Sequence, residues 1–298
     1  MCFCMLLSYG QEVDENFVKG QEFFGNKEYE KALRSFKRAY KSNATLRIKF
    51  WIAHTYAEMD NIDKAKPLFL EIVNSNHQGS EKALSMLNLA NCYSSLKQSD
   101  SAHFYYDLTI SEFPSMASAY FNKGQLLYSE SSFKAAKAQF DKAIEIESGD
   151  WLYYQKRLEV CFATQNYECA LNDLKKVKRL NPKIKVEFNL AYCYSMLEKY
   201  EQADSVFQLI YNEKDAAFLN NYGLNKHNLG NSEEGKKLIR QSLKIAPNNS
   251  FAYRNLALIA IAQSKPKEAC KHLNRALSLG FEKQYGSEVG DLLKKHCN

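Results

Sequence analysis

The chain of 298 residues contains 12 glycines and 5 prolines, under 6 % in total, where average usage is about 12 %. This scarcity excludes turn-rich β-sandwiches, collagen-like repeats and flexible linkers, while a hydrophobic share of 45 % is enough to build a core. The net charge of +6 comes from residues spread along the chain, without a run that would mark a nucleic-acid arm or a polybasic membrane patch. The composition therefore predicts helices joined by short turns.

The first ten residues, Met1 to Gly10, carry no charge and are followed by the polar pair Gln11-Glu12. They resemble the second half of a secretory signal peptide whose basic start is missing. The alternative is an apolar N-terminus that packs on the first helix. We therefore expect a periplasmic or secreted protein, with a cytoplasmic location as the alternative.

A repeat of 32 to 37 residues follows. In the clearest copy, which starts at residue 117, Tyr120, Gly124, Ala136, Phe140 and Ala143 occupy positions 4, 8, 20, 24 and 27. Each copy contains two stretches with apolar residues at i, i+3, i+4 and i+7, which predicts a pair of amphipathic helices. The same frame divides the chain into eight copies, 13–45, 46–82, 83–116, 117–150, 151–183, 184–215, 216–249 and 250–283.

This period and these residues resemble the tetratricopeptide repeat family. The resemblance implies an all-α fold, a right-handed superhelix of helix pairs, in which small residues at position 8, among them Gly20, Gly124 and Gly223, let the two helices approach closely. Residues 284–298 are expected to form a capping helix that covers the last apolar surface. The resemblance also implies a non-catalytic scaffold that holds a peptide or a partner protein in a concave groove. A sensor module of a signalling system whose output domain is absent from this chain is the alternative.

Motifs for chemistry are absent from the sequence. The histidines and cysteines show no metal-ligand spacing, and neither a phosphate-binding loop nor a nucleophile motif occurs. We therefore expect no enzymatic activity, no cofactor and no metal, and the absence of a long apolar run predicts no membrane span. Cys161 and Cys169 could face each other across one helix pair, but the sequence leaves their pairing open, as it does the oligomeric state.

One polar pattern stands out from the repeat. Asparagine is only neutral to poor in the middle of a helix, yet it recurs at position 6 of the first helix. This row resembles the asparagine ladder of peptide-binding members of the family, such as O-GlcNAc transferase, in which the amides hold the main chain of the ligand. The alternative is that these amides bond to their own helix or to a neighbouring repeat. The row consists of Asn88, Asn122, Asn189, Asn221 and Asn255.

The positions beside the row are aromatic or amide-bearing, which suits a peptide better than a nucleic acid. The carboxylate clamp of chaperone-binding members is rejected, because Phe188 and Tyr192 stand where it needs polar and basic side chains. The resemblance therefore predicts peptide contacts by the row together with Phe188, Tyr192 and Arg254. Further groove-facing positions are Phe121, Gln125 and Asn220.

Overall fold

A computed structural model describes residues 14–77 and 79–297. Within those residues the regular structure is entirely helical, which confirms the predicted all-α class. The signal-peptide prediction for residues 1–10 lies outside the described residues. No helix in the described ranges combines the length and the apolar character needed to cross a bilayer.

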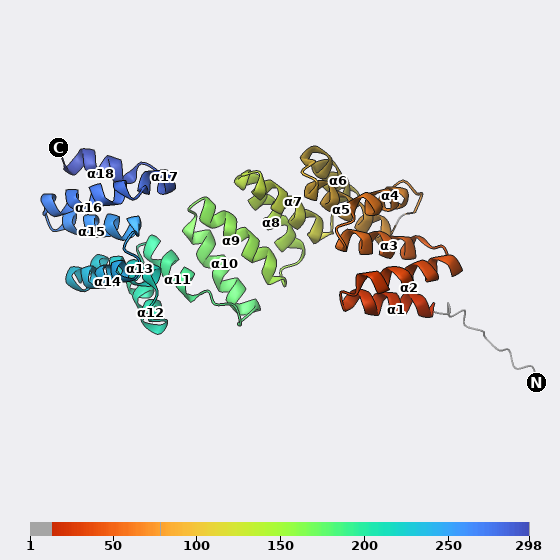
Figure 1. The fold of residues 1–298 in the computed structure, drawn as a ribbon, viewed down its shortest axis with the longest axis horizontal. Coiled ribbons are helices and arrows are strands. Elements are labelled where there is room, and N and C mark those ends of the chain that lie inside the picture. The colour runs from red at the N-terminus through yellow and green to blue at the C-terminus, as the bar shows by residue number, and fades with distance from the viewer. Residues whose placement is uncertain (1–13, 78, 298) are drawn as a thin grey trace, which may run out of the picture. The chain divides into compact units, whose positions relative to one another are not determined.

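The chain divides into two compact units, one ending at Ser148 and one beginning at Gly149. In the first unit each odd-numbered helix packs against the next helix along the chain, so the unit is built from helix pairs (Figure 1). Its helices are α1 (Glu15–Gly25), α2 (Tyr29–Ser42), α3 (Leu46–Glu58), α4 (Ile62–Val73), α5 (Ser80–Ser95), α6 (Ser99–Glu112), α7 (Ala117–Ser129) and α8 (Phe133–Ile146).

The second unit repeats this construction and adds two short helices at its C-terminal end, drawn in blue in Figure 1. Its helices are α9 (Trp151–Ala163), α10 (Tyr167–Leu180), α11 (Glu187–Met196), α12 (Tyr200–Leu209), α13 (Ala216–Asn228), α14 (Ser232–Ile245), α15 (Ser250–Ala262), α16 (Pro266–Ser278), α17 (Phe281–Tyr285) and α18 (Glu288–His296).

The core of each pair is built around the second helix, where a small residue at position 20 and a large one at position 24 lie on one face, four residues apart. Ala136 and Phe140 in α8 are at most 1 % exposed. The same burial is found for Ala32 and Phe36, Ala65 and Phe69, and Ala203 and Phe207. The periodicity of the second helices therefore predicts one half of the core, which first-helix residues such as Leu89 and Phe218 complete.

The turn between the two helices of each pair has one conformation throughout. The residue at position 15 is left-handed, with φ of 59° at Lys97 and 89° at Gly230. The next N–H closes the turn by donating to a carbonyl five residues back, as Gln98 N does to Tyr93 O at 2.9 Å. Although the left-handed conformation costs about 1 kcal/mol for residues other than glycine, the set contains only one glycine: Lys27, Asp60, Lys97, Ser131, Gln165, Glu198, Gly230 and Ser264.

The small residues at position 8 serve two kinds of close approach. In α1 and α7, Gly20 and Gly124 face the rings of Phe36 and Phe140, which a Cβ atom would meet at 2.5 Å and 2.7 Å. In α13 a Cβ on Gly223 would lie 2.7 Å from the carbonyl oxygen of Gly235 in α14. The backbones themselves are therefore in contact where α13 crosses α14.

The C-terminal helices α17 and α18 cover the apolar end of the last pair. Phe281 and Val289 are fully buried in a cluster with Leu273 of α16. A disulfide between Cys270 of α16 and Cys297, the residue after α18, joins the cap to the pair that it covers. The cap is therefore held both by apolar packing and by a covalent bond.

Candidate functional site

Two hollows in the second unit share Tyr192 and Asn221 and together form one depression, called the groove below. Their volumes are about 270 and 320 Å³. Most of the wall comes from the first helices of successive pairs, α9, α11, α13 and α15. The residues that line it are Phe162, Phe188, Asn189, Tyr192, Ser195, Met196, Glu198, Tyr200, Asn221, Leu224, Asn225, Asn228, Arg254 and Leu258.

Helical spacing explains why these residues meet. Asn221, Leu224 and Asn228 are three and four residues apart on α13, and Arg254 and Leu258 are four apart on α15, so each set lies on one face of its helix. The sequence analysis named Tyr192 at position 9 but missed Leu224 and Leu258 at the same position of later copies. It also missed Phe162 at position 12 and Asn228 at position 13. The signal that could have found them is helical spacing. Positions 9 and 13 lie three and seven residues after the asparagine at position 6, so they share its face of the helix.

One end of the groove is aromatic. The ring of Tyr192 lies 6.4 Å from that of Phe162 and 5.8 Å, edge-on, from that of Tyr167. Phe188 packs edge-on against Phe207 at 6.5 Å. Burial raises the pKa of Tyr192, and the neighbouring Tyr167 raises it further. The phenol of Tyr192 is therefore neutral at physiological pH and keeps both a hydrogen-bond donor and an acceptor.

Asn189 and Asn221 are the members of the predicted row that line the groove. Asn189 is exposed. Asn221 is half-buried, and its Nδ2 donates to the Ala217 carbonyl oxygen of its own helix at 2.9 Å. That bond uses Nδ2 of Asn221 and does not involve the acceptor Oδ1. The predicted peptide contact and the predicted alternative, a bond within the helix, are therefore compatible at this residue.

Asn255 occupies a different environment. It is 1 % exposed, and its Nδ2 donates to Oδ1 of Asn220, itself 3 % exposed, at 3.0 Å. Its own Oδ1 accepts a bond from Arg254 Nη1 at 2.9 Å. Burial corrects the sequence-based expectation for both asparagines, because neither amide reaches the groove surface. Arg254 does line the groove, and its Nε also donates to Glu288 Oε1 at 3.0 Å.

In the first unit the row contributes to a separate, more polar hollow of about 490 Å³. Asn122 lines this hollow with Gln125, and its Nδ2 donates to Oδ1 of Asn91 in α5 at 3.0 Å. Asn88 donates to the Leu84 carbonyl oxygen of its own helix at 2.8 Å. Phe121 is 8 % exposed and packs on Phe140, so it is a core residue and not a groove residue.

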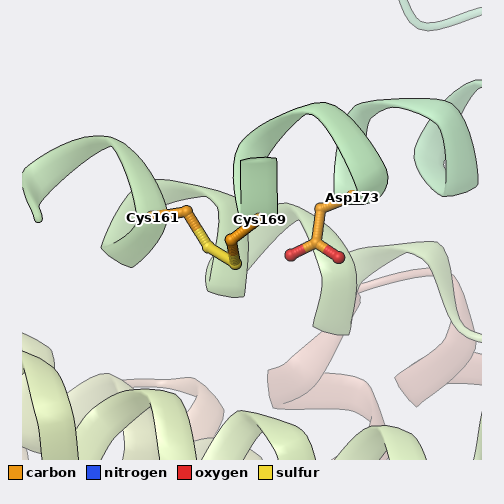
Figure 2. A group of neighbouring side chains, drawn as sticks. All are labelled: Cys161, Cys169 and Asp173. Carbon is orange, nitrogen blue, oxygen red and sulfur yellow. A yellow bond between two sulfur atoms is a disulfide. The ribbon is translucent and has the colours of Figure 1, made fainter. Parts of the chain in front are cut away.

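A cluster of three potential metal ligands lies where α9 meets α10. Sγ of Cys161, Sγ of Cys169 and a carboxylate oxygen of Asp173 all lie within 4.8 Å of one another (Figure 2). The two sulfur atoms are joined in a disulfide, the pairing that the sequence left open. Asp173 accepts two bonds from Arg157, from Nε at 2.9 Å and from Nη2 at 2.5 Å. Since the thiols are oxidised and the carboxylate is neutralised by a guanidinium, the cluster does not suit a cation.

The cysteines of the described residues fall into two groups. Cys161 pairs with Cys169, and Cys270 pairs with Cys297. Cys92 and Cys193 are free and buried, and burial raises the pKa of Cys92 to about 11. The free thiols are therefore protonated and shielded, and unreactive as nucleophiles.

Two family models match parts of the chain. One describes YpiA-like, C-terminal tetratricopeptide repeats and matches residues 185–249. The other describes the tetratricopeptide repeat and matches residues 117–150. No curated protein matches the sequence.

Solved structures resemble the chain over most of its length. The C-terminal part of a TPR repeat-containing protein from Cytophaga hutchinsonii has a TM-score of 0.53 at 15 % identity, over 92 % of this chain and 98 % of that one. A thermophilic TPR protein from Thermus thermophilus has a TM-score of 0.50 at 16 % identity, over 63 % and 96 %. YrrB, described as a TPR protein with an unusual peptide-binding site, has a TM-score of 0.44 at 21 % identity, over 64 % and 97 %. The first two show a shared fold, in agreement with the all-α superhelical class that the sequence predicts.

Proposed function

Because this chain belongs to the tetratricopeptide repeat family, whose fold is that of a protein–protein interaction scaffold, we propose that the groove of its second unit binds an extended peptide segment of a partner protein. The observation that carries this proposal is the sharing of Tyr192 and Asn221 by the two hollows, which places aromatic, aliphatic and amide side chains along one groove.

The chemistry of the lining supports an extended chain over a compact small molecule. A carboxamide offers one donor and one acceptor, the complement of a peptide unit, and Asn189 and Asn221 belong to successive helix pairs along the groove. Tyr192, Leu224 and Leu258 add apolar surface that accepts side chains of varied shape. Such a lining binds the main chain of a peptide and has little selectivity for the identity of its side chains.

We expect the double substitution Asn189→Ala and Asn221→Ala to weaken peptide binding by about 30-fold. Each lost hydrogen bond contributes about 1 kcal/mol, and 1.4 kcal/mol corresponds to tenfold in affinity. The probe is the strongest binder from a phage-displayed library of linear dodecapeptides selected on the immobilised chain. It is synthesised with a fluorescein label and titrated by fluorescence anisotropy.

Asn274→Ala is the matched control for this measurement. Asn274 is exposed on α16, lines neither hollow, and donates to the carbonyl four residues back at 2.9 Å, as Asn221 does. Its replacement should leave the affinity unchanged. Equal affinities for the double variant and the control, with unchanged unfolding transitions, would overturn the contact role of the groove asparagines.

We further propose that the protein acts in a bacterial cell envelope, outside the reducing cytoplasm. The support is the arrangement of the described cysteines, in which two pairs are oxidised and the two remaining thiols are buried. Disulfides persist in the periplasm and are rare in the cytosol. In fractionated cells, the protein should appear in the periplasmic or secreted fraction, and reduction before alkylation should add four maleimide labels. Recovery in the cytoplasmic fraction with all thiols reactive would refute the proposal.

A further inference from the structure

Arg254 is the one basic residue among the side chains that line the groove. The Arg254 side chain is 18 % exposed, and its guanidinium is oriented by contacts on several sides. Nη1 donates to Asn255 Oδ1 at 2.9 Å, and the guanidinium carbon lies 5.8 Å from the centre of the Phe251 ring. The positive charge is therefore held in place at the wall of the groove.

The buried asparagines explain how this orientation is maintained. Asn255 is 1 % exposed and cannot rotate freely, since its Nδ2 is bonded to the equally buried Asn220. The chain of bonds from Asn220 through Asn255 to Arg254 runs from α13 to α15. It fixes the Nη1 edge of the guanidinium and leaves Nε and Nη2 as the donors for an anion. Asn255 is in this respect a positioning residue for Arg254.

Those two donors are occupied by the cap. Nε and Nη2 of Arg254 both donate to the same oxygen, Oε1 of Glu288, the first residue of α18. The neighbouring Val289 is fully buried, and the Cys270–Cys297 disulfide holds the far end of the same helix. The carboxylate of Glu288 is therefore presented to Arg254 from a fixed backbone, although its side chain is 42 % exposed.

We propose that Arg254 is the anion receptor of the groove and that Glu288 occupies it as an internal competitor for an acidic side chain of the bound peptide. This inference rests on the proposed peptide-binding function and specifies its ligand as a segment that carries Asp or Glu. A partly exposed ion pair contributes little to stability, so Glu288 can be displaced. A ligand carboxylate can receive Nε and Nη2 on its two separate oxygens, in the two-pronged geometry that arginine favours.

Glu198 also lines the hollow next to Arg254 and is the acidic residue of that lining. It repels a second carboxylate in the same hollow. The groove therefore selects one acidic residue among uncharged neighbours and disfavours a run of acidic residues. Glu288 has the chemistry of that single residue, because it offers one carboxylate to Arg254.

The test uses the full chain and the dodecapeptide library, selected on the wild-type protein and on Glu288→Gln and Arg254→Gln variants. The wild-type selection should be enriched in Asp or Glu at one position. The strongest binder is synthesised, acetylated and amidated at its ends, together with a counterpart in which that residue is the corresponding amide. The amide counterpart should bind wild-type protein at least about 10-fold more weakly, because two charge-assisted hydrogen bonds are lost.

Glu288→Gln should strengthen binding of the acidic peptide by about 3- to 5-fold, the range expected for removing an exposed competing pair. It should leave the amide peptide unchanged. Glu268→Gln is the matched control, because it removes the same charge from α16 at an ion pair with Arg240 outside the groove. Arg254→Gln should abolish the preference for the acidic peptide, and Arg254→Lys, which keeps the charge, should retain part of it if loss of packing affects the first variant.

The outcomes separate this inference from the function on which it rests. Peptides that are selected, that lose affinity on the Asn189→Ala and Asn221→Ala substitutions, and that show no acidic preference would overturn the role of Arg254 alone. An acidic preference unaffected by Glu288→Gln would overturn the competition by the cap. Failure of every variant to select any peptide would overturn both proposals.

Discussion

Replacing Gly223 with alanine is expected to lower the free energy of unfolding by about 2 kcal/mol, because overpacking costs about 1–3 kcal/mol or more where the neighbour cannot move. The new Cβ would lie 2.7 Å from the carbonyl oxygen of Gly235 and 3.2 Å from the backbone nitrogen of Ile239. Both contacts are backbone atoms of α14, so relief requires the two helices to separate. The gain in helix propensity from glycine to alanine, about 1 kcal/mol, offsets only part of the cost.

The control for this variant is Gly149→Ala in the same unit. A Cβ at Gly149 would meet nothing within 4 Å, so this substitution should be neutral or raise the stability by up to about 1 kcal/mol through the unfolded state. Urea unfolding curves of the two variants make the comparison. Equal midpoints would show that α13 and α14 have room to separate. Since Asn221 and Leu224 flank Gly223 on α13, the first variant should also weaken peptide binding.

Breaking the ion pair between Arg157 and Asp173 should have a larger effect, about 3–5 kcal/mol, as is found when one partner of a buried pair is removed. Asp173 is 1 % exposed and accepts bonds on both carboxylate oxygens, which join α10 to α9. Arg157→Met removes both of these bonds and the charge that neutralises the carboxylate. The reverse change, Asp173→Leu, leaves the guanidinium, which is 19 % exposed and better solvated, so its cost should be smaller.

A double-mutant cycle measures this coupling. The combined Arg157→Met and Asp173→Leu variant should be more stable than Arg157→Met alone, because no buried carboxylate remains unneutralised. Lys142→Met provides the control, since Lys142 and Glu145 form an exposed pair of the same charge types at 2.7 Å, and its loss should leave the unfolding midpoint almost unchanged. A cycle without coupling would show that the pair adds nothing beyond packing.

The sequence predicts the fold better than the site, for a physical reason. Burial at positions 20 and 24 follows from helical periodicity alone, and residues such as Ala136 and Phe140 are buried as expected. The asparagines of position 6 are identical in sequence, yet Asn189 is exposed and Asn255 is 1 % exposed. What separates them is the residue opposite on the neighbouring first helix, such as Asn220, and a repeat pattern does not contain that contact.

The disulfides illustrate the same limit. Cys161 and Cys169 lie on either side of one turn, so their spacing predicts that they can face each other. It does not predict whether they form a disulfide. Cys270 and Cys297 are 27 residues apart, and their bond depends on how the cap folds back on α16. Local periodicity predicts neither that return path nor the contact of Glu288 with Arg254 that results from it.

The left-handed turn at position 15 also has a consequence for how the molecule folds. Each turn is closed by a bond across five residues, such as that from Gln98 N to Tyr93 O, so joining two helices requires only a very short loop to close. The entropy lost on closing a loop grows with its length, and chains rich in local contacts fold fast. Every helix pair can thus act as a starting point for folding, and the array can grow outward from several places at once.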